Sequence, residues 1–310
     1  MCGIAGLILK STGDIGKNLV RMLDGCQHRG PDSTGFAMYH VGCGAALVCR
    51  IYLGCPGDSL DAFNALEKVL SIITEHGGQV LRKTFIREHL RIELHYVGDV
   101  KALCYAIENG AGVEILSMGH NLEIVKGVGT AVEVDAEYGL NTFRGTHGIG
   151  HVRLATESVV DVSRAHPFWA YGFNDVAIVH NGQITNYFKM KRRLMKRGFQ
   201  FRTDNDSELI AVYLADKLND GRTLDEVLEE SVHELDGTFS FLVSTRDAIG
   251  FAKDVLAAKP MVVLERDGLV AIASEEVSLQ RLFPGKSLST FEPFPGTCKT
   301  WHISTRVTRV

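Results

Sequence analysis

The second residue of the chain is a cysteine, and its position brings two reactive groups together. We expect the initiator Met1 to be removed, which leaves Cys2 with a thiol and a free α-amine on one residue. A thiol has a pKa of about 8.5 and an α-amine one of about 7.7 to 8.0, so the amine can accept the thiol proton without a separate histidine. Taken alone, Cys2 is better explained as a small buried strand residue, because unpaired cysteines are commonly buried.

Further along the chain, short segments rich in Gly, His, Arg and Asn follow one another in a fixed order. They are Met1 to Gly6, His28 to Gly35, Gly150 to Thr156, His166 to Phe168, His180 to Asn186 and Asp204 to Glu208. Later ones are Leu235 to Phe241, Lys253-Asp254 with Lys259-Pro260, Ala273 to Glu275 and Phe294 to Gly296. In this order they resemble the class II glutamine amidotransferases, over about residues 1–50 and 140–300. One such segment would mean little, whereas the ordered set is specific.

The resemblance implies that Cys2 attacks the side-chain amide of glutamine and forms a γ-glutamyl thioester. The amine of the same residue would carry the proton to the leaving ammonia, and water would then release glutamate. Asn181 and Gly182 would form the oxyanion hole, in which a side-chain amide and a backbone N–H stabilise the developing charge. Without the resemblance, an Asn-Gly pair is also a strong signal for a tight hairpin turn, so that alternative stays open.

Free glutamine carries a carboxylate and an ammonium on its α-carbon, and the resemblance provides one charge for each. Arg153 presents a planar fork of donors that suits the carboxylate, and Asp206 supplies the negative charge for the ammonium. Such a pair selects a free amino acid over a glutamine inside a peptide. Read locally, Arg153 is a surface charge at a strand end, and one acid of the 204–206 segment is an N-cap for the helix that begins near Ser207.

The resemblance assigns three further residues to the glutamine pocket. Thr156 and His166 would line it, and Arg29 lies in the loop that packs near the nucleophile. Each has a plainer explanation, since a lone histidine is more often structural and the segment Arg29 to Asp32 is typical of a tight turn.

The chain departs from many relatives at two positions, which also help to place it within the family. Leu154 and Glu157 stand where relatives carry Trp and His, so contacts from those positions cannot be transferred. The segments Arg153 to Ser158 and Ala165 to Phe168 look most like the stand-alone amidotransferase subunits of archaeal-type glutamate synthase and related enzymes.

A stand-alone subunit implies a separate synthase subunit that accepts the ammonia. We expect that partner to dock over the mouth of the active site. The inserted segment, about residues 56–140, is either a docking surface for it or a subdomain that only enlarges the core. One alternative is a non-catalytic subunit that senses glutamine or assists assembly of the same complex. Another is an acylase of the N-terminal nucleophile type that hydrolyses other amides, although the paired charges of Arg153 and Asp206 argue against it.

Composition favours small-molecule chemistry. With 33 basic and 37 acidic residues and a net charge of −4, the chain offers no basic surface for nucleic acid or an anionic membrane. No apolar run reaches the roughly 18 residues of a membrane span, and the N-terminus lacks the basic stretch of a signal peptide, so we expect a cytoplasmic protein. The seven cysteines contain no Cys-x-x-Cys pair and no phosphate-binding Gly-rich loop occurs, so neither a metal nor a cofactor is expected.

The periodicity of apolar residues predicts the elements that must position these side chains. Cys2 to Leu9 reads as a strand that carries the nucleophile, Gly148 to Leu154 as a strand around Arg153, and Val176 to His180 as a strand leading to Asn181. Further predicted elements are helices over Ile15 to Gly25, Asp58 to Glu75, Tyr187 to Arg197 and Ser207 to Leu218, and a hairpin of Met261 to Glu265 with Leu269 to Ala273.

The hairpin is antiparallel, so a purely parallel sheet is unexpected. By resemblance the fold is α+β, the four-layer αββα sandwich of N-terminal nucleophile hydrolases, with the nucleophile on an inner strand between two stacked sheets. The whole chain, 1–310, would form one amidotransferase domain. Residues 56–140, which contain no cluster of reactive side chains, would form an inserted α/β subdomain.

Overall fold

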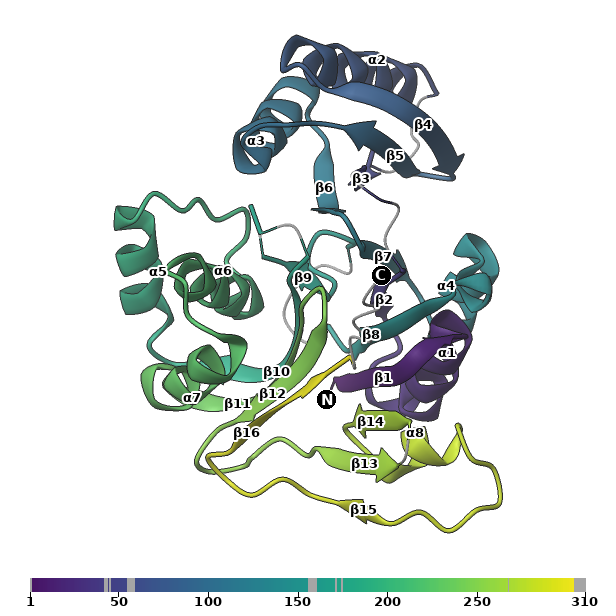
Figure 1. Cartoon of the computed structure of the whole chain (residues 1–310), viewed down its shortest axis with the longest axis vertical. Helices are drawn as coiled ribbons and strands as arrows, with labels where there is room; N and C mark the ends of the chain where they lie inside the picture. Colours follow the sequence, from purple (N-terminus) through teal and green to yellow (C-terminus); the bar gives the residue numbers. More distant parts are fainter. Residues whose placement is uncertain are drawn as a thin grey trace, which may run out of the picture.

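The computed structural model describes residues 2–41, 44, 46–54, 59–155, 161–170, 172–173, 175–266 and 268–303. Two antiparallel sheets are stacked at its centre, and helices cover the outer face of each (Figure 1). The expected four-layer αββα sandwich is confirmed. A third sheet with two helices of its own stands at one end of this sandwich (Figure 1).

The first central sheet has seven strands in the order β15-β13-β14-β1-β8-β2-β7. The bounds are β1 Gly3–Gly13, β2 Ser33–Tyr39, β7 Leu122–Val128, β8 Gly145–Arg153, β13 Val262–Arg266, β14 Leu269–Ala273 and β15 Thr290–Phe291. Its outer face is covered by α1 (Ile15–Gly25), α4 (Ala131–Tyr138) and α8 (Glu276–Gln280), with short 3-10 turns η1 (Gln27–Arg29) and η2 (Leu140–Thr142).

β1 is buried on both faces along its first six residues, because helices pack on one side of it and the second sheet on the other. At Gly6 the absence of a side chain lets the second sheet approach, since a Cβ there would lie 2.9 Å from Leu242 Cδ1. The predicted hairpin of β13 and β14 is confirmed, and β14 pairs with β1 on the side opposite β8. The strand that directly follows Cys2 is therefore central in its sheet and paired on both sides.

The second central sheet has five strands in the order β16-β12-β11-β10-β9. The bounds are β9 Phe168–Trp169, β10 Ala177–Ile184, β11 Gly237–Ser244, β12 Ala248–Lys253 and β16 Cys298–His302. Three helices cover it: α5 (Tyr187–Lys196), α6 (Asp206–Asn219) and α7 (Leu224–Glu234). α6 is buried from Ser207 to Asp216, as expected for a helix enclosed between the sheet and its neighbours.

The third sheet has four strands in the order β4-β5-β3-β6. Its elements are β3 Leu47–Tyr52, α2 Ser59–Glu75, β4 Gln79–Ile86, β5 His89–His95, α3 Val100–Ala111 and β6 Glu114–Gly119. This unit begins before residue 56 and ends before residue 140, where β7 and α4 already belong to the first central sheet and its helices. The predicted helix over 58–75 is confirmed from Ser59 onward.

Among the helices of the described residues, none combines the length and apolar composition that crossing a bilayer would take.

Candidate active site

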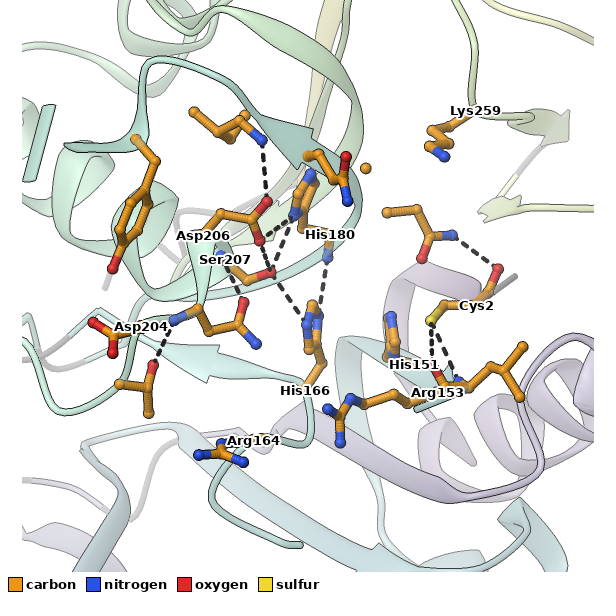
Figure 2. A pocket seen from close by; sticks show the side chains of 18 of the residues that line it. Cys2, His151, Arg153, Arg164, His166, His180, Asp204, Asp206, Ser207 and Lys259 are labelled. Carbon is orange, nitrogen blue, oxygen red and sulfur yellow. Dashed lines mark hydrogen bonds and ion pairs between the residues drawn. The ribbon is translucent and has the colours of Figure 1, made fainter. Parts of the chain in front are cut away.

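A cavity of about 1110 Å³ opens between the ends of the two central sheets. Ligand pockets are commonly about 300–1,000 Å³, so a free amino acid fits with room to spare. Figure 2 shows Cys2 on one side of this cavity and Asp206 on the opposite side, with Arg153 and His166 between them. The residues expected at the site that line it are Cys2, Arg29, Arg153, His166, Asn181, Gly182 and Asp206. Thr156 lies outside the described residues.

Cys2 stands directly before β1 and is half-buried at the cavity wall. Its Sγ accepts a hydrogen bond of 3.4 Å from the backbone N–H of Leu154, and its thiol donates to the carbonyl of the same residue at 3.8 Å. The carbonyl of Cys2 accepts hydrogen bonds from Arg29 Nε at 3.0 Å and from Asn181 Nδ2 at 3.1 Å. Both the sulfur and the main chain of this residue are thus fixed by neighbours from distant parts of the sequence.

Asn181 and Gly182 lie inside β10, where they pair with Ser240 and Phe239 of β11. The hairpin-turn alternative for this Asn-Gly pair is therefore wrong, because the strand continues through it to Ile184. Gly182 has a φ of +146°, and a Cβ at this position would lie 1.9 Å from the carbonyl oxygen of Thr238. Glycine is required here by both conformation and space.

The Asn181 side chain is directed at Cys2. Besides the bond to Cys2, its Nδ2 donates a longer hydrogen bond of 3.4 Å to Ser274 Oγ, which in turn accepts from the backbone N–H of Ile4 at 3.0 Å. Ser274 was not expected at the site. Ser274 belongs to the sequence landmark Ala273 to Glu275, but nothing in the local sequence reveals that its hydroxyl contacts both β1 and β10.

Arg153 ends β8 and is buried at 8% exposure, so its interpretation as a surface charge is wrong. Asp206 is the first residue of α6, and the helix N-cap is Asn205, whose Oδ1 accepts from Ser207 N at 2.9 Å. Asp206 is left to face the cavity, and its Oδ2 accepts from Ile184 N at 3.1 Å. A cation and an anion thus line the same cavity as the thiol.

The Asp206 carboxyl is held in its charged form. Burial opposes its ionisation, but the hydrogen bond and charge of His180 and the backbone N–H of Ile184 together lower the pKa of Asp206 below its usual value. Its place in the first turn of α6 acts in the same direction, because a helix N-terminus favours negative charge.

Three histidines form one wall of the site (Figure 2). His166 stacks on His151 with ring centroids 4.0 Å apart, and its Nδ1 accepts from His180 N at 3.2 Å. Ser207 Oγ lies 3.1 Å from His166 Nε2 and 3.0 Å from His180 Nδ1, and His180 Nδ1 is 3.5 Å from Asp206 Oδ1. Burial lowers the pKa of His166 well below its usual value and that of His151 to about 3, so both rings are neutral at physiological pH.

Arg29 contacts the main chain of Cys2. It forms a short ion pair with Glu275 in addition to its bond to Cys2, and His28 Nε2 lies 2.9 Å from the same carboxylate. Glu275, like Ser274, was recognised only as part of a sequence landmark. Lys259 and Arg164 also line the cavity without having been expected there (Figure 2).

The sequence of the chain matches one known family and is similar to two relatives of nearly the same length. The sequence model of a family described as "Glutamine amidotransferase domain" matches residues 151–281. A Methanothermobacter thermautotrophicus protein that carries the provisional name of a glutamine amidotransferase is 38% identical over 301 residues, which are 94% of this chain and 97% of the relative. The glutamine amidotransferase-like protein GlxB of Rhizobium meliloti is 36% identical over 97% of this chain and 98% of its own length.

Among solved structures, the glutamine phosphoribosylpyrophosphate amidotransferase of B. subtilis aligns with a TM-score of 0.60 at 19% identity. The alignment covers 98% of this chain and 50% of that one, so the chain spans about half the length of this structural relative. At this identity the likeness shows the fold alone.

Proposed function

Because the chain belongs to the glutamine amidotransferase family, we propose that it hydrolyses glutamine to glutamate and ammonia through a γ-glutamyl thioester on Cys2. One observation supports this most strongly: the thiol, the amide of Asn181, the guanidinium of Arg153 and the carboxylate of Asp206 line a single cavity. These groups come from four segments that are far apart in the sequence.

In the proposed reaction, Cys2 Sγ attacks the side-chain carbonyl carbon of glutamine while the α-amine, freed by removal of Met1, takes the thiol proton. The oxygen of the tetrahedral intermediate would bind the N–H of Gly182 and Asn181 Nδ2. Both hydrogens of that Nδ2 already have acceptors, and the bond to Ser274 at 3.4 Å is the longer of the two. We expect the oxyanion to replace Ser274 as acceptor, which leaves the hold on the Cys2 carbonyl intact.

The amine then delivers its proton to the departing nitrogen, which leaves as ammonia. The γ-glutamyl group remains bound to the sulfur of Cys2. Water attacks the thioester and releases glutamate, so atoms and charges balance over the cycle. Arg153 and Asp206 would hold the α-carboxylate and the α-ammonium, with His166 and, by the resemblance, Thr156 beside them. Arg29 would position Cys2 by donating a hydrogen bond to the Cys2 carbonyl. Its side chain would also close the pocket at the end where Cys2 lies.

We further propose that the ammonia passes to a separate synthase subunit of the glutamate synthase type. The resemblance of the segments around Arg153 and His166 to stand-alone subunits supports this, and so does the chemistry, because ammonia released into water is largely protonated and lost. The chain would act as one domain, 1–310, and of the insertion predicted at 56–140 only the part in the third sheet and its helices would lie outside the catalytic layers. Purification from native cells tests the partner: recovery of no synthase would contradict it.

Incubation with glutamine tests the catalytic proposal. The wild-type protein should release glutamate and ammonia in equal amounts, and Cys2→Ala should release neither. Cys298→Ala is a matched control, because Cys298 is also half-buried but does not line the cavity. Intact mass before and after a glutamine-like alkylator should show Met1 removed and one adduct on Cys2. Glutamine binding without turnover would instead support the non-catalytic sensing subunit.

A further inference from the structure

A second cavity, of about 330 Å³, adjoins the glutamine cavity. The two share the lining residues Ser163, Arg202 and Thr203. The second one lies between the third sheet and the core, and its apolar wall includes Phe168 and Trp169 of β9. Its volume is at the lower end of the range for small-molecule sites.

Lys126 of β7 lines this second cavity and has no role in the proposed glutamine chemistry. The residue is only 3% exposed, and its ammonium lies 5.1 Å from the centroid of the Phe168 ring. Among the described residues no carboxylate lies within ion-pair distance of it and no acceptor forms a hydrogen bond with it. Burial lowers the pKa of Lys126 to about 8, which expresses the cost of keeping this charge away from water. Such a cation is unusual unless something pairs with it.

Three carboxylates line the same cavity, and two of them are occupied by donors of the protein. Glu108 accepts from Arg202 at 2.6 Å and from Ile115 N at 2.8 Å. Glu208 accepts from the backbone N–H groups of Arg202 and Thr203 at 2.8 and 2.7 Å, and from the Thr203 hydroxyl.

Glu114 of β6 is the third carboxylate. Within the part of the chain that the structure describes, its hydrogen-bond donor is the Ser163 hydroxyl. A carboxylate has about four acceptor positions, so Glu114 keeps capacity for a further donor. Once the pair of Glu108 and Arg202 is set aside, the cavity offers a buried cation at Lys126 and a carboxylate at Glu114 that do not pair with each other.

We propose that this second cavity binds a free α-amino acid with an apolar side chain, its carboxylate on Lys126 and its ammonium on Glu114. An α-amino acid carries an ammonium and a carboxylate on the same carbon, so a single ligand can pair with both Lys126 and Glu114. The rings of Phe168 and Trp169 supply the surface for an apolar side chain. This site adjoins the glutamine site but uses other charged groups, and it does not depend on catalysis by Cys2.

Trp169 makes the proposal measurable, because it is one of two tryptophans in the chain and lines the cavity. In a Trp301→Phe background, L-norvaline should change the Trp169 emission in a saturable manner. L-norvaline has no side-chain amide that Cys2 could hydrolyse. Lys126→Met and Glu114→Gln should each weaken the response at least about tenfold, since each removes a charged hydrogen-bonding partner. The surface variant Lys68→Met should leave it unchanged.

Two comparisons separate this site from its alternatives. Pentanoate and butylamine each carry one of the two charges of norvaline and should bind at least about tenfold more weakly; equal binding of pentanoate would overturn the assignment in favour of a simple anion site. Arg153→Met should retain the norvaline response. If Arg153→Met abolishes the response while Lys126→Met retains it, norvaline occupies the glutamine cavity and the proposal is wrong. Unfolding midpoints of Lys126→Met and Glu114→Gln verify that both variants fold.

Discussion

The side-chain amide of Asn181 donates a 3.1 Å hydrogen bond to the main-chain carbonyl of Cys2. The two residues belong to different sheets, since Cys2 precedes β1 and Asn181 lies in β10. The bond therefore fixes Cys2 relative to the second sheet. It also places the proposed oxyanion donor beside Cys2, so the stacking of the two sheets would set the geometry of the proposed reaction.

Replacing Asn181 tests its role at the developing charge. Asn181→Ala should lower kcat by roughly a hundredfold to a thousandfold, because it removes a donor that is needed most in the transition state. The KM for glutamine should change little, since ground-state binding would rest on Arg153 and Asp206. Steady-state kinetics of glutamate release measure both. A large rise in KM with unchanged kcat would contradict the assignment.

Ser274 should act as a positioning residue. Ser274→Ala removes the acceptor of the buried Ile4 N–H and should destabilise the fold by about 1–3 kcal/mol. We expect kcat to fall less than in Asn181→Ala, because the bond from Asn181 to Cys2 remains. Ser274→Thr keeps the hydroxyl and should restore part of kcat. An unaltered kcat in Ser274→Ala, at a temperature where it is folded, would argue against positioning.

The proposed charge pair predicts a loss of affinity for glutamine. Arg153→Lys should raise KM by roughly tenfold to a hundredfold, because an ammonium cannot grip a carboxylate with two parallel bonds. Asp206→Asn should have a similar effect while its amide oxygen keeps the bond from Ile184 N. N-acetylglutamine lacks the ammonium and serves as the comparison substrate. The wild type should prefer glutamine over N-acetylglutamine, and this preference should be smaller in Asp206→Asn. An unchanged preference would remove Asp206 from ammonium binding.

Gly182 should tolerate no side chain. In Gly182→Ala the new Cβ would lie 1.9 Å from the Thr238 carbonyl oxygen, so β10 and β11 must separate at the proposed oxyanion site. Gly198→Ala is the matched control, because Gly198 also has a positive φ, of +90°, but no atom within 4 Å of a built Cβ. The control should lose about 1–2 kcal/mol from backbone strain alone. Urea unfolding should show a clearly larger loss in Gly182→Ala.

Buried histidines predict how stability depends on pH. Burial lowers the pKa of His89 and His147 to about 4 and that of His151 to about 3, and it lowers that of His166 as well. The unfolded chain binds these protons near its ordinary pKa of about 6.5, whereas the folded chain does not. Stability is therefore fully present above about pH 6.5 and falls as the pH drops toward 4, by up to about 1.4 kcal/mol per pH unit for each histidine.

Urea midpoints at several pH values between about 7.5 and 5 measure this slope. His147→Gln removes one of the titrating rings and keeps a side-chain N–H for the Thr245 carbonyl, which accepts from the His147 ring at 2.7 Å. Its slope should be shallower than that of the wild type. Equal slopes would mean that His147 does not contribute.

Local sequence determined several elements, both near the site and away from it. The helix of α2 and the hairpin of β13 and β14 follow from apolar periodicity and turn residues, which are local properties. The ordered segments also predicted the αββα fold and the family. β4 and α4 were missed, since short or exposed elements carry a weak periodic signal.

Only the tertiary structure decided the conformation of the Asn-Gly pair and the direction in which Asp206 faces. It also decided which residues surround Ser274 and Lys126. A turn signal at Asn181-Gly182 is overridden because pairing with β11 carries the strand onward. Asn205 takes the N-cap and leaves Asp206 to the cavity. Ser274 and Lys126 gain their surroundings from strands distant in sequence. Periodicity reports which face of an element is buried, but not which partner it meets there, because that depends on how whole sheets and helices pack together.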